Sequence, residues 1–185
     1  MHIVLIGYRG SGKSAVGRRL AERLRMPFYD TDDLVKIKTG RSIRAIVEER
    51  GWPYFRRIEC EVIEELAALQ DGVIATGGGA VLEEGNCRIL KRRGLVIWLA
   101  ADVATMVHRM REDVRDEEQR PPLSRDNMLR EAEEVLGQRT PIYRRLADSC
   151  VDTAGKNIDE IVDEVSHFLE EMRSGKKEAT CREIP

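Results

Sequence analysis

Long hydrophobic runs, clustered cysteines and a charge excess of one sign are all missing from this chain of 185 residues. No apolar stretch approaches the roughly 20 residues that a membrane-spanning helix needs, so a membrane protein is not indicated. The four cysteines lie far apart without a C-x-x-C pair, which argues against zinc and thiol-redox motifs and favours reduced thiols. Because 31 basic residues stand against 33 acidic ones, no general attraction to nucleic acid is expected. We therefore expect a soluble, cytoplasmic protein.

The most informative segment that is present follows the apolar run 3–6. Residues 7–14 read GYRGSGKS, a complete G-x-x-x-x-G-K-S pattern. In this pattern the glycines let backbone N–H groups surround a di- or triphosphate, Lys13 reaches the β- and γ-phosphates, and the Ser14 hydroxyl can ligate Mg²⁺. The next residues have helical spacing, which places the anion at a helix N-terminus. The chain is therefore predicted to bind a nucleoside triphosphate.

Apolar runs typical of buried strands recur along the chain at 3–6, 73–75 and 95–99, and more weakly at 28–29 and 150–151. Segments with helical spacing lie between them. Strands that lack polar alternation and are separated by helices favour a parallel sheet covered on both faces. We therefore expect an α/β fold, in which ligands bind beyond the carboxyl ends of the strands.

A single domain is expected over residues 1–172 because the length suits one core. Residues 112–127 are polar and broken by prolines, which suits a mobile lid between two helices. The alternative for that segment is a solvated surface loop. The C-terminal tail, residues 173–185, is mostly polar and is expected to be frayed and without a role.

Two aspartates follow the second strand signal. Asp30 and Asp32 stand at i and i+2, which in an extended segment would point both side chains into the cleft. Beside a phosphate-binding loop, one carboxylate can hold a metal-bound water and the other can accept a hydroxyl proton. The alternative is structural, since Thr31 or Asp32 is a plausible N-cap of the following helix.

Glycines and arginines complete the candidate site. Residues 76–79 read TGGG, which is either an anion-binding nest of backbone N–H groups or a turn without a ligand. Most arginines are solvated surface charges, but an arginine fork can clamp a carboxylate or phosphate through two parallel hydrogen bonds. Arg56, Arg120 and Arg139 are the candidates for such a clamp, and Arg109 and Arg111 end the helix before the expected lid.

Taken together, these segments resemble the shikimate kinases. The matching segments, in order over residues 1 to about 165, are GYRGSGKS (7–14), DTD (30–32), FRRIE (55–59), TGGGAV (76–81), RPPL (120–123) and RTPIY (139–143). The resemblance implies a three-layer P-loop kinase of the nucleoside-monophosphate-kinase-like family, with a five-stranded parallel sheet in the order 2-3-1-4-5 flanked by helices. It also implies transfer of the γ-phosphoryl group of ATP to the 3-hydroxyl of shikimate, a step toward chorismate and the aromatic amino acids.

On the nucleotide side, the resemblance assigns the metal to Ser14, which would ligate Mg²⁺, and to Asp30, which would support it through water. The adenine is expected between the Arg109–Arg111 region and residues 153–156. The groups implied in holding ATP come from the glycine-rich loop, the helix before the lid and the lid itself: Gly10, Ser11, Gly12, Lys13, Ser14, Ala15, Arg111 and Arg120.

On the acceptor side, the resemblance implies that residues 33–62 form the substrate-binding region. Asp32 would hold the 3-hydroxyl and serve as the base, while Arg56 and Arg139 would bind the carboxylate of shikimate. Backbone contacts to the substrate are implied for the glycine turn: Gly77, Gly78 and Gly79. The residues implied in catalysis are charged groups, with the lid arginine closing over the transferred phosphate: Lys13, Asp32 and Arg120.

The chain departs from the usual family pattern at three places. Ala15 stands where Thr is usual, and the segment 120–123 has a second proline that stiffens it. Trp52 replaces an acid shortly before Arg56, which bears on acceptor specificity. We weigh two rivals to a monomeric shikimate kinase: a kinase of the same fold for another acceptor such as gluconate, and a non-catalytic nucleotide-binding module. The Arg56/Arg139 pair favours a cyclic hydroxy-acid as the acceptor.

Overall fold

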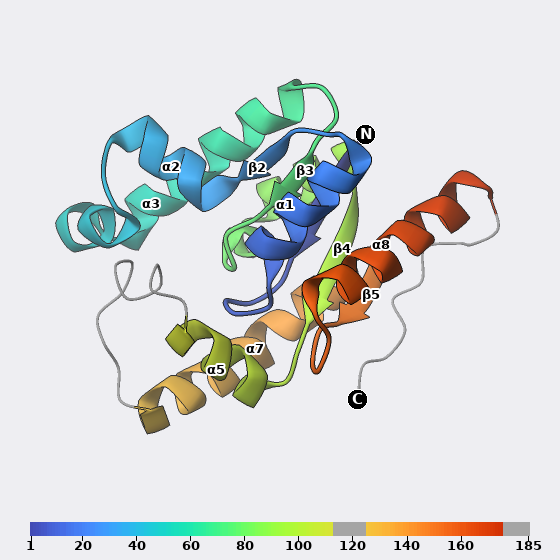
Figure 1. The fold of residues 1–185 in the computed structure, drawn as a ribbon. Coiled ribbons are helices and arrows are strands. Elements are labelled where there is room, and N and C mark those ends of the chain that lie inside the picture. Colours follow the sequence, from blue (N-terminus) through green and yellow to red (C-terminus); the bar gives the residue numbers. More distant parts are fainter. Residues whose placement is uncertain (113–124, 176–185) are drawn as a thin grey trace.

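A computed structural model describes residues 1–112 and 125–175 of the chain (Figure 1). In these residues, parallel strands form one sheet in the order β2-β3-β1-β4-β5, which confirms the order that the resemblance implied. The strands are β1 (His2–Ile6), β2 (Phe28–Asp30), β3 (Val73–Ala75), β4 (Gly94–Ala100) and β5 (Ser149–Asp152). Each strand lies on one of the apolar runs seen in the sequence, including the two weak ones.

Helices pack on both sides of this sheet (Figure 1). They are α1 (Lys13–Leu24), α2 (Thr31–Thr39), α3 (Ile43–Ala68), α4 (Glu84–Arg93), α5 (Val103–Glu112), α7 (Arg125–Leu146) and α8 (Ile158–Arg173), with a short 3-10 helix η1 (Ala80–Leu82).

The central strand β1 shows how the two faces are filled. Ile3 and Leu5 face α1 and α8, whereas Val4 and Ile6 face the core formed with α3, α4 and α7. Successive side chains of a strand point to opposite faces, so a continuous apolar run is what a sheet covered on both sides requires. The three-layer arrangement expected from the sequence is therefore confirmed.

The strand register brings three chain segments to the same edge of the sheet. Leu5 of β1 pairs with Ala75 of β3, and Ala75 pairs with Asp30 of β2. The loops that follow these three strands therefore leave the sheet side by side. This edge carries the glycine-rich loop, the aspartates and the glycine turn, as expected for ligand sites in parallel sheets.

Two helices differ from a simple reading of the sequence. Helix α3 is kinked at Gly51, where φ is 76°, and Pro53 stands just beyond the kink. A proline is tolerated in the first turn of a helix, so α3 effectively restarts there and places Arg56 near a helix start.

The C-terminal tail was expected to begin at residue 173, but Arg173 is the last residue of α8. Residues 176–185 lie outside the described residues.

The segment expected to form a lid, residues 112–127, lies between two helices. Glu112 ends α5 and Arg125 begins α7, so both margins of that segment are helical. Residues 113–124, including Arg120, lie outside the described residues.

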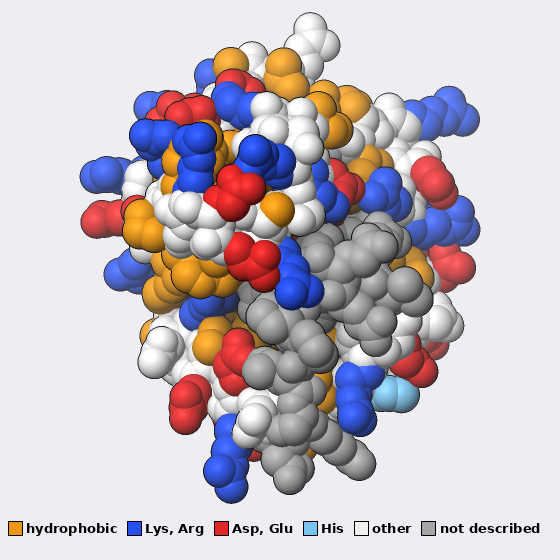
Figure 2. Space-filling model, turned by 90° about the vertical axis from the view of Figure 1, so that its left-hand side faces the viewer, with side chains coloured by type: hydrophobic (Ala, Val, Ile, Leu, Met, Phe, Trp, Pro, Cys, Tyr) orange, Lys and Arg blue, Asp and Glu red, His pale blue; other side chains and the backbone are white. Residues whose placement is uncertain are grey.

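Within the described part of the chain, no helix is long and apolar enough to cross a membrane. Basic and acidic side chains are interspersed over the face drawn in Figure 2.

Candidate active site

A cavity of about 730 Å³ opens at the edge of the sheet where these loops meet. Its volume is in the usual range of small-ligand sites. The wall combines the glycine-rich loop, the start of α2, the turn after β3, the end of α5 and the start of α8. Representative lining residues from these five segments are Lys13, Asp32, Gly78, Arg109 and Asn157.

The glycine-rich loop has the conformation that its sequence predicts. Gly10 and Gly12 have φ of 71° and 91°, in the left-handed region that side chains rarely adopt. A Cβ atom on Gly10 would also overlap the carbonyl of Met106. Helix α1 starts directly behind the loop at Lys13, so its free N–H groups and the positive end of its dipole face the cavity. Together these features form an anion-binding cradle.

Lys13 is buried in the floor of this cradle. Its Nζ donates to the Tyr8 carbonyl at 2.7 Å and lies 3.4 Å from Ser11 Oγ. Burial lowers the pKa of Lys13 to about 8, and the nearby carboxylates of Asp32 and Asp30 oppose that shift. The ammonium group is therefore desolvated, and an incoming anion would stabilise its charged form.

Ser14 in the first turn of α1 and Asp30 at the end of β2 are joined by a hydrogen bond. The Ser14 hydroxyl donates to Asp30 Oδ2 at 2.6 Å. The other oxygen, Asp30 Oδ1, accepts from the backbone N–H groups of Asp32 and Asp33 and caps α2. The N-cap is thus Asp30, and the alternative that placed Thr31 or Asp32 there is wrong. One carboxylate both starts a helix and presents an oxygen beside a serine hydroxyl.

Asp32 reaches the cavity for a different reason from the one its spacing suggested. It stands in the first turn of α2 and not in an extended segment, yet both Asp30 and Asp32 line the cavity. Thr31, between them, is buried and accepts a hydrogen bond from the Gly77 N–H at 2.8 Å. This bond ties the start of α2 to the glycine turn and brings the Asp32 carboxylate against Gly77.

Arg56 projects from α3 toward the same turn. Its guanidinium forms an ion pair with Glu59, whose side chain is fully buried at 0% exposure. Burial raises the pKa of Glu59, and the positive charge of Arg56 counteracts this. Trp52, 44% exposed, packs edge-to-face on Phe55, and Arg56 Cζ lies 5.5 Å from the Trp52 ring centroid. The guanidinium is therefore held by a buried acid and by aromatic rings.

The glycine turn is crowded at its first and last residues, Gly77 and Gly79. A Cβ atom on Gly77 would lie 2.5 Å from Glu59 Oε1 and 2.7 Å from Asp32 Oδ1. One on Gly79 would overlap the guanidinium of Arg56. Neither of these glycines has a positive φ, so close approach and not backbone conformation requires them. The turn therefore brings its backbone next to three charged side chains.

Two side chains of helix α7 bind the glycine turn. Arg139 Nη1 and the Tyr143 hydroxyl both donate to the Gly78 carbonyl oxygen, at 3.0 Å and 2.6 Å. The two donors are four residues apart on α7, so they lie on one helix face. Tyr143 is fully buried, and its ring stacks on Trp98 of β4 with centroids 5.8 Å apart.

The far end of the cavity is closed by α5 and the loop after β5. Arg109 donates to the Thr153 hydroxyl at 2.9 Å and to the Thr153 carbonyl at 2.6 Å, and its Nη1 lies 3.4 Å from the Gly10 carbonyl. Arg109 lines the cavity, whereas Arg111 is exposed and outside the lining. Residues two positions apart lie on different helix faces, so only one of the two arginines can face inward.

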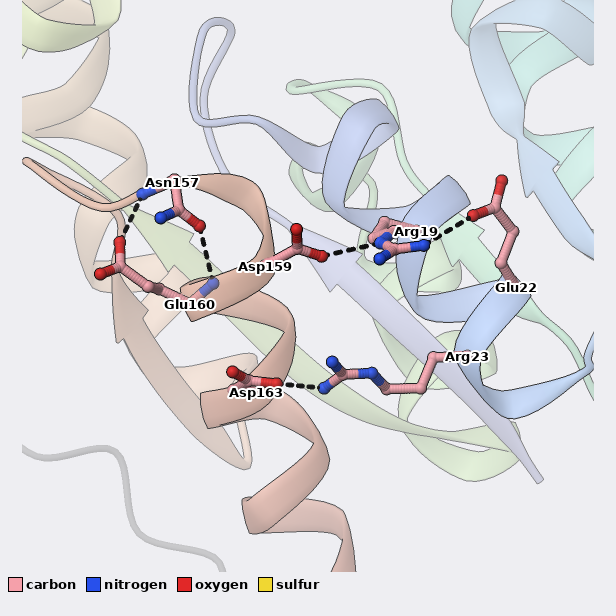
Figure 3. A network of polar contacts seen from close by, with 7 residues as sticks. All are labelled: Arg19, Glu22, Arg23, Asn157, Asp159, Glu160 and Asp163. Carbon is pink, nitrogen blue, oxygen red and sulfur yellow. Dashed lines mark hydrogen bonds and ion pairs between the residues drawn. The ribbon is translucent and has the colours of Figure 1, made fainter.

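Figure 3 shows how the start of α8 is fixed beside the cavity. Asn157 and Glu160 form a reciprocal capping box at the helix N-terminus. Arg19 of α1 donates to Asp159 at 2.7 Å, and Arg23 pairs with Asp163 one turn further along α8. Each of these exposed ion pairs contributes little on its own. Together they connect the helix behind the glycine-rich loop with the segment that closes the far end.

Of the residues assigned to phosphate, metal and acceptor, Lys13, Ser14, Asp30, Asp32 and Gly78 line the cavity. Arg56 and Arg139 lie against the glycine turn but are not among the lining residues. Glu59 and Tyr143 were not among the predicted site residues. Both belong to segments of the resemblance, but neither spacing nor charge signalled that they hold Arg56 and the Gly78 carbonyl. In the described residues, no group of three or more His, Cys, Asp or Glu residues is arranged to bind a metal ion.

Comparisons with known proteins agree with this site. The sequence profile of the shikimate kinase family matches residues 9–170. The chain is 44% identical to the shikimate kinase of Syntrophus aciditrophicus, over 93% of this chain and 92% of the relative. A solved structure of Acinetobacter baumannii shikimate kinase in complex with shikimate superposes with a TM-score of 0.86 at 33% identity, covering 93% of this chain and 94% of that one.

A gluconokinase from Sinorhizobium meliloti is less similar. It has a TM-score of 0.58 and 20% identity, covering 95% of this chain and 97% of that one. That likeness shows a shared fold alone. The family profile spans most of the chain, and the curated relative above is matched over nearly its full length. The chain belongs to the shikimate kinase family.

Proposed function

We propose that this protein transfers the γ-phosphoryl group of ATP to the 3-hydroxyl of shikimate, acting as an ATP:shikimate 3-phosphotransferase. One observation carries the proposal: an anion cradle and an arginine-lined acid site meet at the same edge of the sheet. The cradle contains Lys13 and Ser14, and the acid site contains Asp32, Arg56 and Arg139. Phosphoryl transfer depends mainly on positioning and charge neutralisation, which these groups supply.

Mg²⁺ fits the donor groups beside the cradle. Ser14 Oγ and Asp30 Oδ2 lie 2.6 Å apart, and both are hard oxygen donors. Mg²⁺ typically takes only one or two protein ligands and completes its shell with water and phosphate oxygens. Ser14 would bind the ion and Asp30 would hold one of its waters. When bound, the ion neutralises charge that develops on the β- and γ-phosphate oxygens.

On the acceptor side, Asp32 is proposed to accept the proton of the 3-hydroxyl. Asp32 and Lys13 line the same cavity and interact electrostatically, so the hydroxyl would lie near the γ-phosphate. Arg56 and Arg139 flank the glycine turn and are proposed to bind the carboxylate as two charged donors. The N–H groups of Gly78 and Gly79 would add neutral donors to the same ligand, while the Gly77 N–H is held by Thr31.

On the nucleotide side, residues 10–15 would hold the phosphates. Arg109 and the loop 153–156 would enclose the adenine, and the exposed Arg111 would contribute at most at the rim. Arg120 is proposed to close over the transferred phosphate as part of a lid that excludes water. Residues 1–172 are proposed to act as one kinase domain, with 33–62 as its substrate-binding region.

A cytoplasmic monomer is part of the same proposal. The groups proposed for ATP and for shikimate all come from residues of this one chain. Cys60, Cys87 and Cys150 are free thiols, as suits the reducing cytoplasm.

The test is ADP release from MgATP with shikimate, gluconate or AMP as acceptor, one at a time. Stimulation by shikimate alone is the expected result, because two arginines and a base suit a hydroxy-acid, whereas a nucleotide acceptor would call for a base pocket. The product should carry phosphate on the 3-hydroxyl, which phosphorus NMR can assign. Stimulation by gluconate or AMP and not by shikimate would contradict the proposal.

The buried lysine gives a separate expectation for pH. The charged form of Lys13 binds the phosphates, and its pKa in the free protein is about 8. Below pH 8 the group is already protonated, so ATP affinity should be flat with pH. Above pH 8, binding must take up a proton, and the affinity should fall by up to about tenfold per pH unit.

Calorimetry at pH 8.8 in buffers of different ionisation enthalpy measures this proton uptake directly. We expect close to one proton taken up per ATP at pH 8.8 and almost none at pH 6.8. Equal uptake at the two pH values would contradict the depressed pKa of Lys13.

A further inference from the structure

The inference concerns Tyr143, a residue outside the proposed catalytic and binding groups. Its side chain is 0% exposed, and its hydroxyl donates to the Gly78 carbonyl at 2.6 Å. Burial raises the pKa of Tyr143 to about 12, so the hydroxyl remains a donor at any physiological pH. The ring is fixed by stacking on Trp98. A rigid, permanently protonated donor therefore points at one atom of the glycine turn.

The carbonyl of Gly78 has a second donor, Arg139 Nη1, at 3.0 Å. A carbonyl oxygen has two lone pairs, so Arg139 and Tyr143 can use it at the same time. Arg139 is also proposed to bind the substrate carboxylate. If the guanidinium turns toward that ligand, Tyr143 keeps the carbonyl hydrogen-bonded. Without the hydroxyl, releasing Arg139 would leave a partly buried acceptor unsatisfied, which is costly.

The hydroxyl also controls the next peptide group. A trans peptide is planar, so the Gly78 carbonyl and the Gly79 N–H point in opposite directions. Drawing the carbonyl toward α7 therefore turns the Gly79 N–H away from α7. Within residues 1–112 and 125–175, the N–H of Gly79 donates no hydrogen bond. It is therefore an unused donor at a buried position, and Gly79 itself lies against the Arg56 guanidinium.

We propose that Tyr143 is a positioning residue for the acid acceptor: its hydroxyl fixes the Gly78–Gly79 peptide, which frees Arg139 and orients the Gly79 N–H toward the ligand. The proposal rests on shikimate being the acceptor, as proposed above. It assigns a specificity role to a residue that touches neither substrate. Because ATP phosphates bind at the glycine-rich loop, the effect should be confined to the acceptor.

The test is Tyr143→Phe, which removes the hydroxyl and keeps the ring that packs on Trp98. We expect the KM and the calorimetric Kd for shikimate to rise about fivefold to tenfold, as for loss of one hydrogen bond. The KM for ATP should stay within about twofold. Tyr29→Phe is the matched control, because Tyr29 packs on the same core but contacts Gly72, at the opposite end of β3. It should leave both KM values unchanged.

A second variant separates positioning from general weakening. The two single variants, Arg139→Lys and Tyr143→Phe, and the double variant form a double-mutant cycle in which the Kd for shikimate is measured. Since both side chains act on one carbonyl, the two effects should fail to add. Additive effects, or an equal rise of both KM values in Tyr143→Phe, would overturn the proposal.

The wild-type protein provides a measurement that does not depend on the variant folding. The backbone amide of Gly79 should shift in a proton–nitrogen NMR spectrum when shikimate is added, and much less when ATP is added. An unchanged Gly79 signal at saturating shikimate would overturn the proposal. If the wild type is not stimulated by shikimate at all, the proposed function fails instead, and the acceptor assay detects that separately.

Discussion

Asp32→Asn is expected to reduce the turnover number with shikimate by at least about 100-fold, the usual contribution of a general base. Asparagine has the same shape but cannot accept the 3-hydroxyl proton. ATP binding should persist, because the cradle of residues 10–15 does not include Asp32. Stopped-flow or coupled assays give the turnover number, and calorimetry gives the ATP Kd, which we expect within about threefold of wild type.

This comparison is best made at pH 7. The Asp32 carboxylate opposes the lowering of the Lys13 pKa, so its loss should lower that pKa further. At pH 7 most of Lys13 should still be protonated in the complex with ATP. Asp163→Asn is the control for the same chemical change, since Asp163 pairs with Arg23 on the outside of α8. A turnover number near wild type in Asp32→Asn would show that another group accepts the proton.

Arg139→Ala is expected to raise the KM for shikimate by about 10-fold to 100-fold, as for loss of a charged hydrogen-bonding partner. The KM for ATP should change little, because Arg139 donates to the Gly78 carbonyl, and its contact with the glycine-rich loop is to the Tyr8 ring, 6.0 Å from the ring centroid, and not to a phosphate-binding group. Steady-state kinetics with each substrate varied in turn measures both values. Arg144→Ala, an exposed position on the same helix, removes the same charge from α7 and should alter neither KM. Parallel increases in both KM values would contradict the carboxylate clamp.

Those parts of the fold that depend on local pattern could be predicted from the sequence. The run 3–6 and the GYRGSGKS segment are contiguous, and each carries its own physical signal. The order of the sheet came only from the family resemblance, because strand pairing between β1 and β3 joins residues about 70 positions apart. No spacing rule reports on such contacts.

The site shows the same limit. Asp30 and Asp32 do share the cavity, but the extended segment expected from their spacing is a helix that begins at Thr31. The phase of α5, which the buried Met106 and Met110 define, turns Arg109 and not Arg111 into the cavity. Glu59 and Tyr143 act through partners far away in the sequence, so only the folded chain could identify them. Arg120 stays a prediction.

The crowding at Gly77 and Gly79 has a consequence for how acceptor range can change in this lineage. Any side chain there would strike Asp32, Glu59 or Arg56, so a mutation at either glycine damages the machinery before it reshapes the pocket. Trp52 is half-exposed and lies against Arg56 from the other side. We therefore expect variants that accept a new hydroxy-acid, in nature or in a directed-evolution library, to carry substitutions in the part of α3 after Gly51. Substitutions there can shift Arg56 without placing a side chain in the glycine turn.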